Sequence, residues 1–148
     1  MSILERIDSD LKVAMKSSEK IKVSTLRMVK ASLKNLEIEK GELSDDDVIG
    51  VLSTQAKQRR ESISEFEKGG RQDLADQERE ELAVILGYLP EQLSEEELTG
   101  IILETIKETG ASSLKDMGRL MKSLMPRVKG RADGKLVSRK VKELLGKQ

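Results

Sequence analysis

Aromatic side chains are almost absent from this chain of 148 residues, which contains one Phe, one Tyr and no Trp. Any buried core must therefore be built from Leu, Ile, Val, Met and Ala side chains. Stretches rich in β-branched and aromatic residues, the usual signal for strands, do not occur. Charged residues make up 36% of the chain, a share typical of helices that keep one long face in water. The sequence thus predicts an all-α fold.

Helix-start and helix-stop signals recur along the chain and divide it into seven predicted helices. A Ser followed three positions later by an acidic residue forms a capping box at Ser2, Ser44, Ser94 and Ser113. Gly and Pro residues predict the stops, and Pro126 is expected to end the sixth helix. The predicted helices cover residues 2–16, 19–40, 44–68, 73–87, 94–109, 113–126 and 133–145.

The segment 90–94 begins with Pro90 and is interpreted as a hinge, because a proline disfavours helix in the residue before it. This hinge would separate an N-terminal subdomain of four helices, residues 1–90, from a C-terminal subdomain of three helices, residues 91–148. The length of the chain is compatible with two small units of this kind.

Positive charge is concentrated in the last 38 residues of the chain. Residues 111–148 hold eleven Lys or Arg and three Asp or Glu, a net charge of +8, whereas the preceding 110 residues carry −8. A basic region of this strength predicts a surface for a polyanion, and folded nucleic acid is the favoured one. The alternative is an ordinary solvated helix face that happens to be rich in Lys and Arg.

The basic residues of this region repeat with helical spacing. Lys115, Arg119 and Lys122 are separated by four and three positions, and the same spacing recurs later. Apolar residues are expected on the opposite side of each helix, namely Met117, Met121 and Leu124 on the sixth and Val137, Val141 and Leu144 on the seventh. The predicted RNA-binding residues are Lys115, Arg119, Lys122, Arg127, Lys129, Arg131, Lys135, Arg139 and Lys142.

The absence of aromatic residues from residues 111–148 narrows the expected ligand. Proteins that bind single strands generally stack bases on aromatic side chains. A helical basic surface without them fits the phosphate backbone of a structured RNA, and it predicts little base-specific readout. We do not expect DNA to be the ligand.

Several classes of function and location are disfavoured by the residues that the chain lacks. It contains no His and no Cys, which excludes thiolate metal sites and His-dependent nucleophilic catalysis, and it has no glycine-rich phosphate loop. The sequence predicts no catalytic residue, no cofactor and no metal site; the run 45–47 of three aspartates is interpreted as the first turn of a helix. No apolar segment is long enough for a signal peptide or a membrane span, so we expect a cytoplasmic protein.

Two segments of the C-terminal region, 117–121 and 126–137, resemble the signature of the YqeY family. The segments 57–62, 70–74 and 88–90 of the N-terminal half are also similar to that family, so the resemblance covers nearly the whole chain. Residues from about 90 to the end are similar, more loosely, to the tail domain of GatB, the B subunit of the tRNA-dependent amidotransferase. The residues of the motif for which a structural role is expected are Met117, Gly118, Gly130, Asp133 and Gly134. Gly118 would permit a close approach of helices, Gly130 a left-handed turn, and Asp133 a helix cap.

The resemblance implies a function in tRNA metabolism. In the amidotransferase the tail domain contacts the outer corner of tRNA, and YqeY-like domains fused to a glutaminyl-tRNA synthetase assist tRNA binding. The expected function is a non-catalytic tRNA-binding accessory protein for aminoacylation or amidation, with an aminoacyl-tRNA synthetase or an amidotransferase as a possible further partner. One alternative is a helical adaptor that binds a protein through the acidic N-terminal half. Another is a subunit of a carbon–nitrogen ligase that uses glutamine as amide donor, although amidotransferase chemistry lies outside the tail domain.

Overall fold

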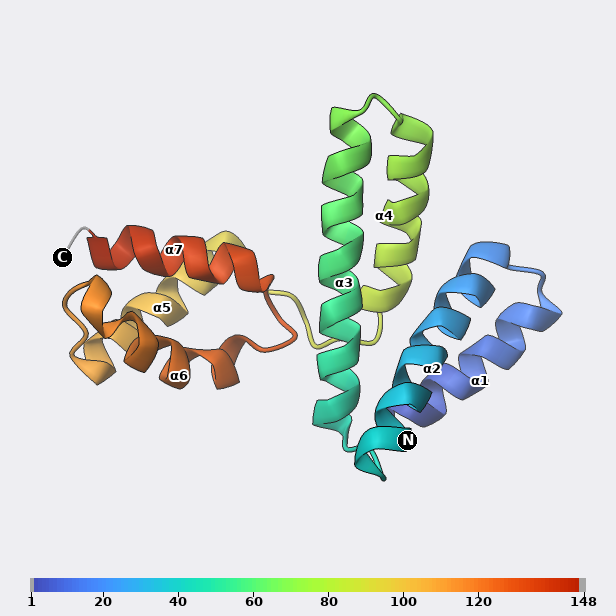
Figure 1. Cartoon of the computed structure of the whole chain (residues 1–148), viewed down its shortest axis with the longest axis horizontal. Coiled ribbons are helices and arrows are strands. Elements are labelled where there is room, and N and C mark those ends of the chain that lie inside the picture. Colours follow the sequence, from blue (N-terminus) through green and yellow to red (C-terminus); the bar gives the residue numbers. More distant parts are fainter. Residues whose placement is uncertain (1, 147–148) are drawn as a thin grey trace. The chain divides into compact units, whose positions relative to one another are not determined.

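The structure is a computed structural model that describes residues 2–146, and within this range it contains helices and no strand (Figure 1). The all-α prediction is therefore confirmed, with four helices followed by three. A single turn of 3-10 helix, η1 (Leu114–Asp116), precedes the sixth helix. The α-helices are α1 (Ile3–Lys16), α2 (Lys20–Lys40), α3 (Asp45–Lys68), α4 (Gln72–Leu86), α5 (Glu95–Thr109), α6 (Met117–Val128) and α7 (Gly134–Gly146).

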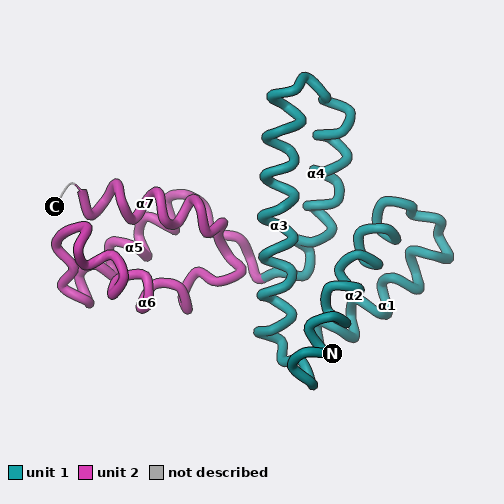
Figure 2. Tube along the Cα trace, viewed as in Figure 1, with its two compact units in different colours: residues 1–89 teal, residues 90–148 magenta. Residues whose placement is uncertain are grey.

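The chain divides into two compact units, residues 1–89 and residues 90–148 (Figure 2). The N-terminal unit consists of two helical hairpins, α1 with α2 and α3 with α4. Its core is aliphatic except for Tyr88 and consists of Ile7, Leu11, Leu26, Val29, Leu33, Val48, Leu52, Ala56 and Ile85. In the C-terminal unit, α5, α6 and α7 share a second core of Leu98, Ile102, Ile106, Ala111, Leu120, Leu124, Val128, Val137, Val141 and Leu145.

Capping boxes start α3 and α5 as the sequence predicts, because each is made by local hydrogen bonds. The Asp47 amide donates to the Ser44 hydroxyl over 3.1 Å, and the Ser44 amide donates to the Asp47 carboxylate over 2.9 Å. The pKa of Asp47 falls to about 2, first because Lys40 bonds to its carboxylate and then because Ser44 donates to it. The aspartates at 45–47 thus form the first turn of α3, and no group of metal-ligating side chains is found among the described residues.

The sixth helix differs from its prediction at Pro126, which lies inside α6 instead of ending it. A proline in a helix removes one backbone hydrogen bond, but here it sits in the last turn. Val128 beyond it is 1% exposed, and the Lys129 amide still donates to the Met125 carbonyl over 2.9 Å. Burial of Val128 in the core therefore outweighs the single bond that Pro126 removes.

The inward face of α6 is also shifted from its prediction. Leu120, Leu124 and Val128 are buried, whereas Met117 and Met121 are half-buried at the edge of the core. Apolar residues cover a wide arc of this helix, and helical spacing alone does not select which row faces α5 and α7. On α7 the buried residues are Val137, Val141 and Leu145, and Leu144 is half-buried.

Candidate nucleic-acid interface

The start of α6 is fixed by hydrogen bonds to the Asp116 carboxylate. The Ser112 amide donates to it over 2.8 Å and the Ser113 amide over 3.3 Å. The Ser112 bond is the main reason that the pKa of Asp116 is lowered. Asp116 also lies 3.4 Å from the guanidinium of Arg119, whose side chain stays 57% exposed. This turn therefore presents Lys115 and Arg119 to solvent on a fixed backbone.

Seven of the nine predicted RNA-binding residues are exposed on η1, α6, α7 and the loop between the helices. On both α6 and α7 they lie away from the buried aliphatic row, which is the arrangement that the helical spacing indicated. We call them the C-terminal basic set: Lys115, Arg119, Lys122, Lys129, Lys135, Arg139 and Lys142.

The other two predicted residues, Arg127 and Arg131, are half-buried and support the fold of the C-terminal unit. Arg127 forms an ion pair of 2.5 Å with Glu108 and a hydrogen bond of 3.1 Å to the hydroxyl of buried Thr105. The Arg131 side chain donates to the Glu91 carbonyl over 3.3 Å. Both side chains are thus committed to contacts with α5 and the segment before it, so they are less available to a ligand than the C-terminal basic set.

The residues of the family motif have distinct structural roles. Gly130 has a φ of 77°, the left-handed conformation that favours glycine. The Asp133 carboxylate accepts a hydrogen bond of 3.4 Å from the Lys135 amide at the start of α7. Gly118 does not serve a close helix contact. A Cβ added there would have no heavy atom within 4 Å apart from its chain neighbours and the nearby backbone of its own helix, and the same holds for Gly134.

Acidic residues of the C-terminal unit gather on α5, away from the basic set in the sequence. Glu95, Glu96, Glu97 and Glu104 are exposed on this helix. Glu97 closes the capping box with Ser94. The hydrogen bond from the Ser94 backbone amide is the main cause of the lowered pKa of Glu97. Negative charge on α5 would repel a polyanion, so the positive surface of this unit lies on η1, α6, α7 and the loop between the helices.

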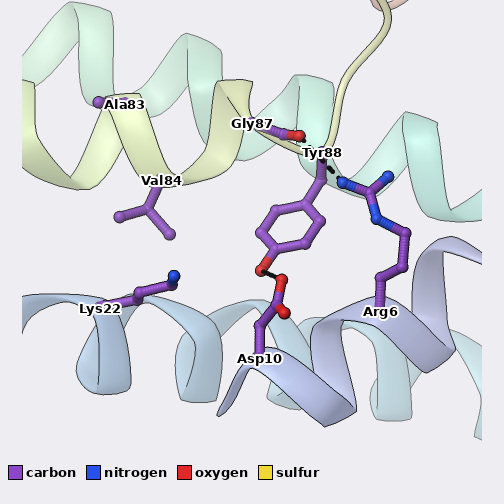
Figure 3. A pocket seen from close by; sticks show the side chains of 7 residues that line it. All are labelled: Arg6, Asp10, Lys22, Ala83, Val84, Gly87 and Tyr88. Carbon is purple, nitrogen blue, oxygen red and sulfur yellow. Dashed lines mark hydrogen bonds between the residues drawn. The ribbon is translucent and has the colours of Figure 1, made fainter. Parts of the chain in front are cut away.

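The N-terminal unit contains an open pocket of about 370 Å³ between α1, the start of α2 and the end of α4 (Figure 3). The Tyr88 hydroxyl donates to the Asp10 carboxylate over 2.5 Å. Arg6 donates to the Gly87 carbonyl over 3.3 Å, and its guanidinium carbon lies 5.2 Å from the centre of the Tyr88 ring. These contacts tie the end of α4 to α1, which gives the tyrosine of the 88–90 motif a structural role.

Tyr88 provides a pH-dependent test of this contact. Burial raises the pKa of Tyr88 well above its usual value of about 10, and the bond to Asp10 adds to the shift. A raised pKa in the folded state means that the stability contributed by the protonated phenol is present below about pH 10 and is lost as the pH rises further.

We expect the phenolate absorbance of native protein to appear well above pH 10, and that of protein unfolded in guanidinium near pH 10. The chain has one Tyr and no Trp, so the spectrum reports Tyr88 alone. The variant Asp10→Asn should move the native midpoint down. A native midpoint near 10 would contradict the buried hydrogen bond.

Comparisons with known proteins place the sequence in a family. The model of the family described as Yqey-like protein matches residues 4–145. The chain is 34% identical over 151 aligned positions to "Altered inheritance of mitochondria protein 41, mitochondrial" of Pyrenophora tritici-repentis, covering 97% of this chain and 81% of that protein. Proteins of the same name from Vanderwaltozyma polyspora and Eremothecium gossypii are 36% and 37% identical over 85 and 88 positions. Those two matches cover 56% and 58% of this chain but only 46% and 48% of the relatives, about half of their length.

The names of these relatives contradict the expected cytoplasmic location, because they describe mitochondrial proteins. The expectation was wrong because it rested on the lack of an apolar segment. Mitochondrial targeting segments are amphipathic and basic instead of continuously apolar, so the lack of an apolar segment does not distinguish the two locations. Among the described residues, no helix is both long and apolar enough to cross a membrane.

Proposed function

This chain belongs to the Yqey-like protein family, and from that premise we propose that it is a non-catalytic accessory protein that binds tRNA through its C-terminal unit. The observation that carries the proposal is the C-terminal basic set, seven exposed Lys and Arg side chains on η1, α6, α7 and their connecting loop. Phosphate groups of a folded RNA need several cations held at spacings of a few ångströms, and two packed helices supply them.

The availability of these cations supports the proposal. Within residues 2–146, the side chains of Lys115, Lys122, Lys129, Arg139 and Lys142 take part in no described hydrogen bond or ion pair. A phosphate would therefore not have to displace an internal partner from them. Arg119 has only its exposed pair with Asp116, which is of the kind that contributes little to stability.

The likeness to the tail domain of the amidotransferase subunit supports tRNA as the RNA concerned. We propose that the chain assists aminoacylation or amidation of tRNA, together with an aminoacyl-tRNA synthetase or an amidotransferase that supplies the chemistry. No ligase activity of its own is proposed, because the likeness is to the tail domain alone.

The alternative of an adaptor that binds a protein through the acidic N-terminal half is less well supported. Three acidic residues near the free end of the α3–α4 hairpin are paired within it: Arg79 contacts Glu67 and lies 2.8 Å from Asp76, and Arg71 lies 3.3 Å from Asp73. Paired charges of this kind are a weak attractant for a basic partner.

A fluorescence anisotropy titration tests the proposal, with labelled tRNA compared against a duplex RNA and an unstructured single strand of similar length. We expect the tightest binding to tRNA and the weakest to the single strand, because residues 111–148 contain no aromatic residue for base stacking. Equal and weak binding to tRNA and duplex would defeat the tRNA assignment and leave a generic basic surface. Copurification of RNA and protein from native cells would identify the partner.

A further inference from the structure

The N-terminal unit contains a second concentration of positive charge, which the acidic composition of the first 110 residues conceals. Residues 1–40 hold nine Lys or Arg and six Asp or Glu, whereas residues 41–89 hold six and twelve. The α1–α2 hairpin is therefore basic and the α3–α4 hairpin acidic. Positive and negative charge are thus separated within the unit, and a separation of this kind produces a positive potential over the α1–α2 hairpin that attracts anions.

Two side-chain contacts between α1 and α2 show where the basic residues of this hairpin lie. Both cross the seam, the line along which α1 and α2 pack against each other. Lys30 on α2 forms an ion pair of 2.7 Å with Asp8 on α1, and the Arg27 guanidinium lies 4.0 Å from the sulfur of Met15. Residues three or four apart on a helix are neighbours on its surface. The two helices of this hairpin run in opposite directions. Lys12 therefore lies one turn from the Asp8–Lys30 pair toward the α1–α2 connection, and Lys34 lies one turn from it on the other side.

We name this surface the N-terminal basic face. It consists of Lys12 and Lys16 on α1 and of Arg27, Lys30 and Lys34 on α2. Lys30 is neutralised by Asp8, but Lys12, Lys16 and Lys34 are exposed and take part in no described hydrogen bond or ion pair within residues 2–146. Arg27 is exposed and contacts only the Met15 sulfur among its described partners. The acidic residues along the seam are Glu5 and Asp8 on α1 and Glu37 on α2, so five basic and three acidic side chains leave the face with a net charge of +2.

We propose that the N-terminal basic face is a second phosphate-binding surface, so that the chain holds one structured RNA with both of its units. The proposal rests on the proposed function for the identity of the RNA. Because the two units are joined directly at Leu89 and Pro90, a second contact on the same RNA is intramolecular and gains from a high effective concentration. An anionic membrane fits this face less well. Such binding needs a broad apolar strip between the cations. The exposed apolar side chains of α1 and α2 are the separate residues Val13, Met15, Met28 and Ile38. The continuous apolar faces of both helices are buried in the core of the unit.

The double variant Lys12→Glu with Lys34→Glu tests the proposal, since both side chains lie in mid-helix and have no described partner. The matched control is Lys57→Glu with Lys107→Glu, which changes the charge equally at two exposed lysines outside both basic surfaces. Anisotropy titrations of labelled tRNA at several salt concentrations provide the readout. We expect the log–log salt slope of the test variant to be smaller in magnitude by about 1.4–1.8, and its affinity at 0.1 M salt to fall by on the order of tenfold or more, while the control changes little.

The outcomes separate this inference from the proposed function. Equal behaviour of the test and control variants would overturn the N-terminal basic face, even if changes on α6 and α7 abolish binding. A loss in the test variant without any loss from changes on α6 and α7 would show binding by the N-terminal basic face alone, which would defeat the C-terminal site and overturn binding by both units. Unchanged tRNA binding combined with reduced binding to phosphatidylserine vesicles would also overturn the proposal. Circular dichroism melting checks the fold of each variant, and Lys12→Gln with Lys34→Gln replaces the test pair if the Glu pair unfolds.

Discussion

Replacing the buried arginine of α3 by Arg59→Met is expected to lower the free energy of unfolding by about 3–5 kcal/mol, because it leaves two half-buried carboxylates without their counter-charge. The Nε atom of Arg59 lies 3.1 Å from Glu81 and 3.5 Å from Glu78, both on α4. The arginine side chain is 9% exposed, so solvent cannot take over its role. This cluster joins the two helices of the α3–α4 hairpin, and its other guanidinium edge contacts the Met28 sulfur on α2.

Urea denaturation followed by circular dichroism measures this effect, with Lys57→Met on the same helix as the control that should change stability by no more than about 0.5 kcal/mol. The triple variant Arg59→Met, Glu78→Leu, Glu81→Met should recover most of the loss, since apolar replacement of a whole buried ion cluster is often neutral or stabilising. A small loss in the single variant would show that Arg59 is not the counter-charge that holds the hairpin together.

The pH dependence of the Arg59 cluster has a definite sign. Burial and the neighbouring Glu81 carboxylate raise the pKa of Glu78 above its usual value near 4.5. A carboxyl whose pKa is raised on folding contributes most stability when it is protonated, and that contribution is lost as the pH rises through the folded pKa. The Arg59→Met variant should therefore regain part of its stability as the pH falls from 7 toward 4.5.

The second large effect is expected in RNA binding, for the double variant Arg119→Glu with Arg139→Glu. Two lost phosphate contacts, each contributing about 0.7–0.9 to the log–log salt slope, imply a loss of roughly 25- to 60-fold in affinity at 0.1 M salt, and the introduced carboxylates add repulsion. The loss should be the same for different tRNAs, because the contacts position the backbone and do not read bases. Both side chains are exposed and lie away from the buried rows of α6 and α7, so the melting temperature should change little.

The variant Lys57→Glu with Lys107→Glu again serves as the matched control for net charge. If it weakened tRNA binding as much as Arg119→Glu with Arg139→Glu, the effect would be long-range electrostatics and not contact at α6 and α7. The adaptor alternative makes a different prediction, in which tRNA binding is absent or nonspecific in every variant.

Local signals in the sequence were sufficient for the existence of the seven helices and for the starts of α3 and α5. The box at Ser113 opens the 3-10 turn η1 instead, and α6 begins at Met117. The capping boxes at Ser44 and Ser94 depend on residues three positions apart, so the sequence alone reveals them. The continuation of α6 past Pro126 was missed because it depends on the burial of Val128 against other helices. The row of α6 that contains Leu120 was missed for the same reason, since tertiary packing selects it.

Charge patterns in the sequence predicted the basic surface but not which cations the fold uses internally. Arg127 and Arg131 belong to the same run as the exposed residues, and only the positions of Glu108 and the Glu91 carbonyl reveal their structural contacts. Arg59 has acidic residues near it in the sequence of α3, but its ion-pair partners Glu78 and Glu81 are on α4, which the sequence does not reveal. The N-terminal basic face was concealed because residues 1–40 and 41–89 have opposite charge.

The salt dependence of tRNA binding by the unmodified chain tests the central claim most directly. If five to seven cations of the C-terminal basic set engage phosphates, a plot of the logarithm of affinity against the logarithm of salt concentration should have a slope of roughly −4 to −6. Further contacts from the N-terminal basic face would make the slope steeper. A slope near zero, which means an affinity for tRNA that is independent of salt, would contradict the account, whether or not tRNA is preferred over duplex RNA.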